Sequence, residues 1–347
     1  MKIKNSGLNE RFRKVLEFVV TDYISTAEPV GSRTICKRYG IQLSPATVRN
    51  VMADLEDLGF LWQPHTSAGR IPTDKAFRFY VDKILNVQSL SQSEREKIRR
   101  KYRTSRYAIP ELLRETSRIL SGVSHYTGVV LAPMMASTIF KHIQFIRLTT
   151  DQILAVFVTS GGTLQNKIVH MDDVLSQDEL DKMSRYLNEM LKGLTLAQVR
   201  EKILGEMKRE KVAFDRLMEQ ALTLGHRTFS NQEEKELYIN GQTNILDEPE
   251  FANIEKMKSL FRAFEEKSLL ITLLDQCLAG EKLQITIGSE SECSEMEGCS
   301  LVSSTYGNVD RTLGILGIIG PRRMNYSRVI PVVEFTAQLL TEFLELE

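Results

Sequence analysis

The chain is 347 residues long and carries 45 Lys and Arg residues against 45 Asp and Glu residues, so its formal net charge at pH 7 is zero. This balance excludes a chain that is basic throughout, such as a protein that coats nucleic acid. The longest apolar runs, Ile153 to Val158 and Leu313 to Ile319, are much shorter than the ~18 residues of a membrane span. The N-terminus lacks the apolar stretch of a signal peptide, so we expect a cytoplasmic protein of two or three domains without membrane contact.

The cysteines and histidines do not indicate a metal site or a catalytic centre. Four cysteines are too few for a disulfide scaffold in a chain of this length, and Cys293 and Cys299 have no histidine between them. The histidines from His125 to His226 are scattered, and no nucleophile motif lies near them. We therefore expect no metal, no cofactor and no enzyme activity.

The neutral total hides two regions of opposite charge. Residues 1–106 hold 20 basic and 11 acidic residues, a net charge of +9, and residues 107–347 hold 25 basic and 34 acidic residues, a net charge of −9. A basic region joined to an acidic one suggests a nucleic-acid-facing domain on a body with another task. Two domains with differently charged solvated surfaces would give the same pattern, so charge alone leaves both interpretations open.

Turn residues divide the basic region into short helices. Apolar residues at helical spacing predict a first helix from Asn9 to Ile24. Ser32 is expected to cap a second helix that stops at Gly40. A third helix is expected from Pro45 to Leu58, capped by Ser44. The short connection between the last two matches the spacing of a helix-turn-helix motif, whose second helix enters the major groove of DNA.

The third helix separates into two faces when it is projected at 100° per residue. An apolar stripe from Val48 to Leu58 is expected to pack inward, and the opposite face is small or polar. Arg pairs with guanine, Asn with adenine and Ala with the thymine methyl group, so this face is suited to reading bases, although any amphipathic helix has a polar outer face. The acidic C-terminal end would repel phosphates, so the N-terminal half should enter the groove. The residues that we expect to contact DNA are Ser44, Ala46, Thr47, Arg49, Asn50 and Ala53.

A short hairpin is predicted directly after this helix. Phe60 to Gln63 and Ile71 to Thr73 are strand-like, and the segment between them is rich in turn formers, with one arginine expected near its tip. Such a hairpin is the wing of a winged helix-turn-helix domain, and it can reach a phosphate or the minor groove. The expected DNA contacts here are His65, Thr66, Ser67 and Arg70.

Three long motifs stand in the first 82 residues, and two shorter ones follow in the body: Glu28 to Arg33, Ser44 to Asn50, His65 to Thr73, Gly128 to Pro133 and Gly317 to Pro321. In these motifs the chain closely resembles the HrcA family of bacterial heat-inducible transcription repressors. The resemblance is densest from Leu8 to Asp82 and weaker through the rest of the chain.

The resemblance implies an α+β, multidomain fold. In this fold an N-terminal winged helix-turn-helix domain precedes a GAF-like α+β domain that is interrupted by an inserted dimerisation domain. It also implies a homodimer that binds double-stranded DNA at an inverted repeat, the CIRCE operator of chaperone operons of the groE and dnaK type. The resemblance implies in the same way that repression is released on heat shock and that the GroEL chaperonin favours the active repressor.

The pattern of the acidic region agrees with an α+β fold. Strands are expected between residues 127 and 170, and a mostly helical region begins with a capping box at Ser176 to Glu179. Within it, the segment from Leu237 to Leu246 is compatible with a strand pair around Asn240 and Gly241. Strands return between residues 283 and 319, and a helix closes the chain. This order along the chain, in which strands are followed by helices and then by strands again, suggests that one domain is inserted in another.

We place the domain borders by these changes of pattern. The expected domains are 1–90 for the winged helix-turn-helix domain, 91–109 for a basic linker, 110–171 and 276–347 for the two parts of the GAF-like domain, and 172–275 for the inserted dimerisation domain. Seven basic residues lie between residues 93 and 106. This basic segment is expected to be either a solvated linker or a supplementary contact to phosphates.

Two rivals to a repressor controlled by the chaperonin remain open. The first is a regulator of the same DNA-binding type that is controlled by a small ligand in its GAF-like domain. The second is an enzyme whose body does the chemistry and whose basic region only tethers it. The fold alone does not distinguish these functions, and no residue in the sequence identifies a ligand.

Overall fold

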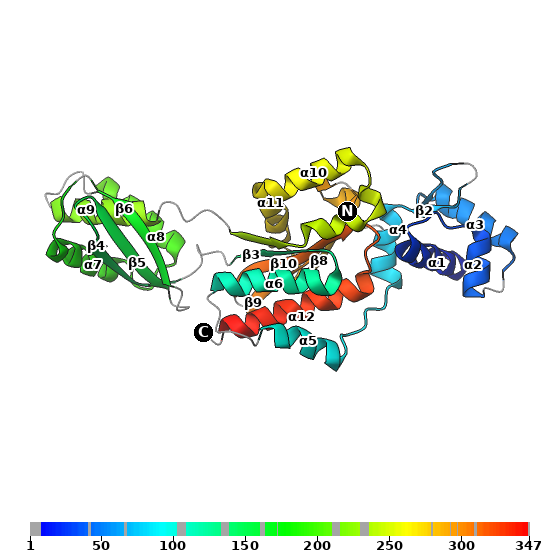
Figure 1. The fold of residues 1–347 in the computed structure, drawn as a ribbon, viewed down its shortest axis with the longest axis horizontal. Helices are drawn as coiled ribbons and strands as arrows, with labels where there is room; N and C mark the ends of the chain where they lie inside the picture. Colours follow the sequence, from blue (N-terminus) through cyan, green and yellow to red (C-terminus); the bar gives the residue numbers. More distant parts are fainter. Residues whose placement is uncertain are drawn as a thin grey trace. The chain divides into compact units, whose positions relative to one another are not determined.

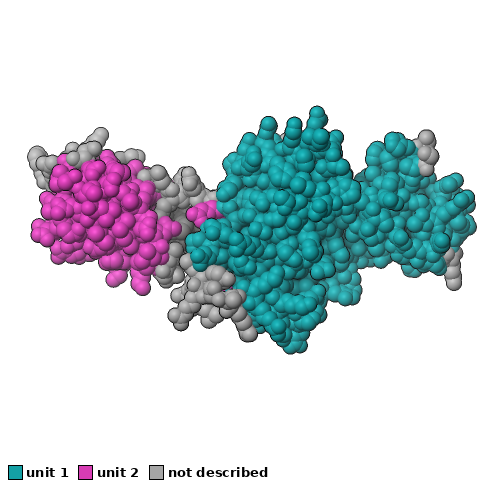
Figure 2. All heavy atoms as spheres, in the orientation of Figure 1, with its two compact units in different colours: residues 1–131, 237–342 teal, residues 132–236, 343–347 magenta. Residues whose placement is uncertain are grey.

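The fold is seen in a computed structural model of the full chain. The structure describes residues 8–40, 43–65, 68–102, 109–132, 139–159, 164–171, 173–209, 216–229, 236–278, 280–291, 293–296, 298–308 and 311–345. These residues form two compact units of mixed α and β structure, so the α+β, multidomain class is confirmed (Figure 2). Unit 1 comprises Met1–Leu131 and Leu237–Glu342, and unit 2 comprises Ala132–Glu236 with Phe343–Glu347.

Unit 1 begins with three helices and a two-stranded antiparallel sheet, followed by a fourth helix that ends in a π-helical turn. We call this part, residues 8–84, the head. Its elements are α1 Glu10–Thr26, α2 Ser32–Tyr39, α3 Pro45–Asp57, β1 Leu61–Trp62, β2 Ile71–Pro72, α4 Asp74–Phe79 and the π-helical turn Tyr80–Ile84.

The three expected helices of the head are all present. The side chain of Asn9 caps α1 and accepts a hydrogen bond from the backbone N–H of Arg11 at 2.7 Å. The second helix differs in its start, because Gly31 occupies the cap position and Ser32 is the first helical residue. Buried apolar side chains hold the three helices together: Val15, Leu16, Val19, Val20, Ile35, Val48, Val51, Met52 and Leu55.

Residues 92–131 and 237–342 of unit 1 form the body, and residues 85–91 connect it to the head. Its centre is an antiparallel five-stranded sheet in the order β7-β3-β10-β9-β8. The strands are β3 Thr127–Leu131, β7 Leu237–Asn240, β8 Leu283–Ile287, β9 Cys299–Asn308 and β10 Arg311–Pro321. The helices are α5 Gln92–Tyr102, α6 Ile109–Ser124, α10 Ile254–Glu265, α11 Lys267–Leu278 and α12 Tyr326–Glu345, with 3-10 turns at Gln242–Asp247, Pro249–Phe251, Gly288–Glu290 and Ser294–Met296.

Helices cover both faces of the five-stranded sheet. The helices α6 and α12 lie on one side of it, and α10 and α11 lie on the other (Figure 1). Val129 and Ile319 belong to the core on the side of α10 and α11. Val130 and Leu316 point to the opposite face and are fully buried. The sheet therefore has no face in contact with solvent at its centre.

The basic segment expected as a linker is largely the helix α5, which packs on the body. Its Ile98 and Tyr102 are buried, and the Tyr102 hydroxyl lies 3.0 Å from the hydroxyl of Thr116 on α6. Arg99 pairs with Glu342 of α12 at 3.3 Å. The segment is thus anchored by its apolar side chains, while Arg103 and Arg106 lie outside the described residues.

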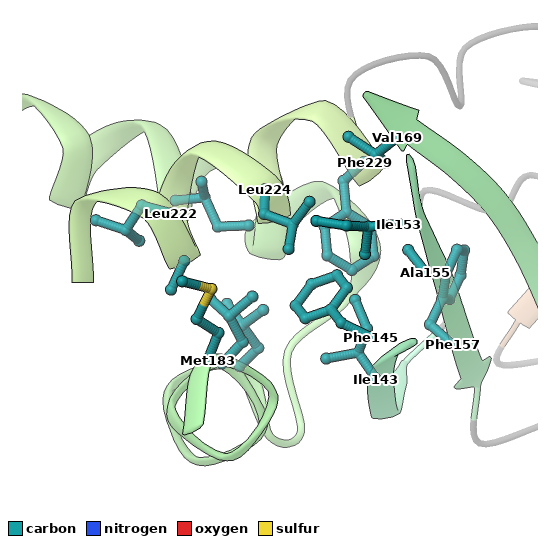
Figure 3. Close-up of a cluster of buried hydrophobic side chains, with 14 of the residues drawn as sticks. Ile143, Phe145, Ile153, Ala155, Phe157, Val169, Met183, Leu222, Leu224 and Phe229 are labelled. Atoms are coloured by element: carbon teal, nitrogen blue, oxygen red, sulfur yellow. The ribbon is translucent and has the colours of Figure 1, made fainter. Parts of the chain in front are cut away.

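Unit 2 is a three-stranded antiparallel sheet with three helices packed on one face. Figure 3 shows side chains of the core between the sheet and the helices. The strand order is β4-β5-β6, and the elements are β4 Phe140–Arg147, β5 Gln152–Thr159, β6 Leu164–His170, α7 Gln177–Leu191, α8 Leu196–Arg209 and α9 Arg216–Phe229. Phe145 and Phe157 of the sheet point toward Leu224 and Phe229 of α9. The capping box at Ser176 and Glu179 is present at the start of α7, as expected.

The borders of the compact units differ from the borders expected from the sequence. The strands β4 to β6 were expected in the GAF-like sheet, but they pair only with one another among the described strands. The helices α10 and α11 were expected in the inserted domain, but they pack on the five-stranded sheet. The breaks lie at Leu131–Ala132 and Glu236–Leu237 instead of residues 172 and 275. The expected strand pair from 237 to 246 is also absent, because β7 pairs with β3 and a 3-10 turn follows it.

Candidate nucleic-acid interface

The N-terminal end of α3 is fixed by its own first residues. The Ser44 hydroxyl accepts a hydrogen bond from the backbone N–H of Thr47 at 3.1 Å, and Pro45 occupies the first helical position. The two hydroxyl groups of Ser44 and Thr47 lie 2.9 Å apart. Proline sets the backbone angle of the first turn and the serine satisfies a free N–H, so the sequence itself starts the helix at this point.

The two faces of α3 are those expected from the sequence. Val48, Val51, Met52 and Leu55 are buried against the rest of the head. On the opposite face Ala46, Arg49 and Asn50 are exposed, and Thr47 and Ala53 are partly buried. Within the described part of the chain, the side chains of Arg49 and Asn50 have no hydrogen-bonding partner, so their donor and acceptor groups face solvent.

The hairpin after α3 forms where it was expected. Leu61 pairs with Pro72 and Trp62 pairs with Ile71. His65 is exposed, and its carbonyl oxygen accepts a hydrogen bond from the backbone N–H of Ala68 at 2.8 Å. Thr66 and Ser67, the other two expected contacts of the tip, lie outside the described residues.

Arg70 occupies a different place from the one expected. It lies at the base of the hairpin and not near its tip, because its backbone forms two hydrogen bonds with Val30, each 2.9 Å long. Its side chain is only 15% exposed, and its Nε lies 2.8 Å from Oε2 of Glu56 on α3. The arginine therefore links three segments of the head, and its guanidinium group is already paired with a carboxylate.

Gly69 explains why two separate sequence motifs lie against each other. A Cβ atom at this position would lie 2.5 Å from the carbonyl group of Val30 and 2.6 Å from the carbonyl oxygen of Pro29. Real Cβ contacts are not that short, so only glycine allows the hairpin to approach the turn between α1 and α2 this closely. The motif around Pro29 and Val30 thus forms the surface on which the hairpin is seated.

Two basic residues of α2 were missed as candidates. Arg33 and Lys37 are exposed on α2, which packs on α3. In helix-turn-helix proteins the first helix of the motif crosses the DNA backbone, where basic side chains meet phosphates. Their i, i+4 spacing, on a helix whose buried apolar residue is Ile35, was the signal in the sequence that could have found them.

Two further classes of site can be addressed within the described residues. No group of three or more His, Cys, Asp or Glu side chains there is arranged to hold a metal ion. Within the same residues no helix is both long and apolar enough to cross a membrane.

Comparisons with known proteins point to one class. Residues 110–330 match the family model described as the HrcA protein C-terminal domain. The heat-inducible transcription repressor HrcA of Geobacter sulfurreducens is 52% identical over 340 residues, which are 98% of this chain and 99% of the relative. The protein of the same name from Syntrophobacter fumaroxidans is 50% identical over 342 residues, 98% of each chain.

One solved structure has a similar fold. A crystal structure described as that of a hypothetical protein matches with a TM-score of 0.64 and 25% identity, and the match covers 97% of this chain and 98% of that one. Together with the relatives, it defines the class as transcription repressors of α+β, multidomain architecture. The chain belongs to the HrcA family of heat-inducible transcription repressors.

Proposed function

We propose that this protein represses transcription as a homodimer that places one α3 helix in each half of an inverted-repeat operator. The head is interpreted as a winged helix-turn-helix domain in which α2 and α3 form the motif and the hairpin forms the wing. The observation that carries the proposal is the outer face of α3, where Arg49 and Asn50 are exposed and unpaired beside the small residues Ala46 and Ala53. That combination matches the donors, acceptors and methyl groups of the major groove.

Each part of the head has a proposed role on DNA. Arg49 reads guanine, Asn50 reads adenine, and the alanines allow a close approach to thymine methyl groups. Ser44 and Thr47 lie at the helix N-terminus, which favours a phosphate. Arg33 and Lys37 of α2 contact the phosphate backbone. The wing residues His65, Thr66 and Ser67 are proposed to reach the flanking groove.

Arg70 is proposed to act through the shape of the head. Its ion pair with Glu56 neutralises a half-buried negative charge near the end of α3, and its backbone bonds to Val30 hold the hairpin in place. This role replaces the phosphate contact that the sequence suggested for it. The two roles differ in their salt dependence, which gives a direct test below.

The dimer is proposed to form through unit 2. The face of its sheet that the helices do not cover carries six apolar residues, and we call it the open face: Ile146, Leu154, Val156, Val158, Leu164 and Ile168. Gln144 and Asn166 lie on the same face, one on each side of Val156. Ile146, Leu164 and Ile168 are 42%, 62% and 52% exposed. Exposed apolar side chains that gather on one face of a sheet are typical of an interaction site, and a palindromic operator requires a second copy of the same chain.

The operator and the control of repression are proposed from the family resemblance. The operator is CIRCE, before chaperone operons of the groE and dnaK type, and repression ends on heat shock. The body is proposed to be a GAF-like domain, and GroEL is proposed to favour the active repressor. The membership of the family of heat-inducible repressors supports these proposals.

Base reading by α3 can be tested with binding to labelled duplexes. Arg49→Ala and Asn50→Ala are each expected to weaken binding to the inverted repeat by about 1–3 kcal/mol and to change binding to random DNA little. Lys258→Ala, which removes an exposed charge from α10, is the matched control and should change neither. Equal losses on both DNAs would show that these residues do not read bases.

The same duplexes at several salt concentrations separate phosphate contacts from positioning. Arg33→Ala and Lys37→Ala are each expected to lower the slope of log K against log salt by about one. Arg70→Ala is expected to weaken binding to all DNA while leaving that slope unchanged. A reduced slope for Arg70→Ala would restore the phosphate contact that the sequence suggested.

A second candidate function is control by a small ligand, favoured by one cavity in the body. A hollow of about 390 Å³ lies among α5, β8, β9 and α12, and Arg95, Lys282, Phe335 and Gln338 line it. The guanidinium of Arg95 lies 5.5 Å from the centre of the Phe335 ring. The purified protein alone should bind its operator poorly, and added GroEL should restore binding. Restoration by a metabolite extract without GroEL would favour the ligand.

A further inference from the structure

The head is attached to the body through the first residue of α4. The carboxylate of Asp74 accepts hydrogen bonds from the backbone N–H and the hydroxyl of Ser289 at 3.0 and 2.9 Å, and it pairs with Arg322 at 2.7 Å. Burial raises the pKa of Asp74, but the hydrogen bonds from Ser289 and Arg322 outweigh this effect and leave the pKa below its ordinary value. The carboxylate is therefore charged and fully engaged by the body at neutral pH.

The body carries a turn that is shaped to receive this carboxylate. Gly288 has a backbone φ of +52°, and a Cβ atom there would lie 2.4 Å from the nearer carboxylate oxygen of Asp74. A side chain at this position would both strain the backbone and displace the carboxylate. The absence of a side chain at Gly288 is thus what lets Asp74 reach the N–H of Ser289.

Two other arginines reach across the same junction, one from each side. Arg78 of the head pairs with Glu290 of the body, with its Nε 2.8 Å from Oε1, and it also donates to the carbonyl oxygen of Ile285. Arg323 of the body pairs with Glu248 and Glu250 and donates to the carbonyl oxygen of Ile24, at the end of α1, at 3.2 Å. Because charges of both signs alternate across the contact, only one orientation of the head satisfies all of them.

The junction also has an apolar centre and an open edge. The buried Phe77 ring of α4 lies 6.5 Å from the ring of Tyr326 at the start of α12, measured between ring centres. Beside this contact a hollow of about 420 Å³ is lined by Trp62, Lys75 and Arg322, among others. The side chain of Arg322 is 41% exposed, so solvent and salt reach the ion pair.

Three consecutive residues join this junction to the end of α3. The hydroxyl of Thr73 donates to the carbonyl oxygen of Gly59 at 2.8 Å, and the ammonium of Lys75 donates to the carbonyl oxygen of Leu58 at 2.7 Å. Asp74, between them, is held by the body. The two residues that hold the C-terminal end of α3 therefore flank the residue that the body holds.

From this arrangement we infer that Asp74, Ser289 and Arg322 are positioning residues that set the direction in which the body presents α3 to DNA. The inference rests on the proposed function, in which a dimer reads an inverted repeat. It adds the place in the molecule that controls the spacing between the two heads. A head that is fixed on its body reaches the second half-site at high effective concentration only at one half-site spacing. A head released at Asp74 binds a single half-site as before, but it loses that spacing preference.

The test measures how tightly the full-length protein binds two kinds of duplex. The first carries one half-site. The second is a series of full inverted repeats whose spacer grows by up to ~5 base pairs, about half a helical turn. The variants are Asp74→Asn, Asp74→Ala and, on the body, Arg322→Ala. Each is expected to bind the single half-site within about twofold of the parent protein. Each should bind the best full repeat about tenfold more weakly and depend less on spacer length. Glu10→Gln, which removes an exposed carboxylate from α1, is the matched control and should change nothing.

The outcomes separate this inference from the proposed function. If the variants lose the same factor on the half-site and on the full repeat, the junction supports the folding of the head and the inference is overturned. If neither affinity nor spacer dependence changes, it is overturned as well. If the parent protein itself does not prefer the full repeat to the half-site, the dimeric readout fails instead. Arg322→Ala keeps the test valid should Asp74→Ala fold poorly, because it leaves the sequence of the head intact.

Discussion

The two larger sheets of this protein are built from similar apolar strands but are covered differently. In the five-stranded sheet of the body, β3 is buried along its whole length and Leu316 of β10 is fully buried. In the three-stranded sheet of unit 2, β5 alternates between buried and partly buried residues, and Ile168 of β6 is 52% exposed. The first sheet has helices on both faces, and the second has them on one.

This difference shows what an apolar strand does and does not indicate. Ile153 to Val158 is as apolar as the buried strand β3, and a run of this kind is typical of a strand with two covered faces. In unit 2 every second residue of the run points to the open face. An apolar strand therefore does not show whether helices of the same chain cover both of its faces.

Truncation of a central leucine or isoleucine is expected to reveal the largest difference in stability between the two sheets. Leu316→Ala should lower the free energy of unfolding of unit 1 by about 2–5 kcal/mol, because it leaves a cavity between the sheet and the helices α6 and α12. Ile168→Ala, at a concentration where the protein is monomeric, should change unit 2 by less than about 0.5 kcal/mol. Hydrogen–deuterium exchange in increasing denaturant measures both units in one sample. Equal losses would mean that the open face is already covered within one chain.

Charge on the open face is expected to act on association and not on folding. Ile168→Asp should weaken the dimer by at least ~10-fold, because an aspartate would be desolvated in the contact. Sedimentation equilibrium measures the dissociation constant, and circular dichroism should show an unchanged fold. Leu204→Asp, on the exposed surface of α8 in the same unit, is the matched control. A dimer that tolerates Ile168→Asp would place the contact between copies elsewhere.

A further expected effect concerns one hydroxyl group beside the covered sheet. The Tyr306 hydroxyl is fully buried and donates to the carbonyl oxygen of Leu131 at 2.7 Å. Tyr306→Phe should cost about 1–3 kcal/mol at neutral pH, because that carbonyl loses its partner.

The same hydroxyl predicts a pH dependence with a definite sign. Burial raises the pKa of Tyr306 well above its ordinary value of 10.0. A tyrosine whose pKa is raised by folding stabilises the protein fully below pH 10 and loses this contribution as the pH rises further. Unit 1 should therefore become less stable as the pH rises above 10. Tyr306→Phe should reduce this dependence of the free energy of unfolding on pH. An identical alkaline slope in the variant would contradict this assignment.

The sequence predicted the head more closely than the body because local signals define it. Caps, a proline at the first helical position and helical spacing fix α1 to α3 within a few residues. The outer face of α3 followed from the same periodicity. The ion pair of Arg70 with Glu56 did not, because it joins residues fourteen positions apart through the seating of the hairpin on Val30.

The domain borders could not be predicted in the same way. Strand patterns showed where strands lie but not which strands pair, and β3 pairs with β7 and β10, far along the chain. The turn at Asn240 and Gly241 has the residues of a hairpin, yet β7 is followed by a 3-10 turn because its pairing partner is already β3. The junction around Asp74 was likewise invisible, since its partners lie more than 200 residues away.

The open face also bears on how such a repressor responds to temperature. Association through apolar surface weakens on cooling and is maintained or strengthened on moderate warming, because its driving force near 25 °C is entropic. A dimer that is held by Ile146, Leu164 and Ile168 would thus be kept together by the warming that ends repression. By this argument, moderate warming does not weaken the proposed contact between the two copies.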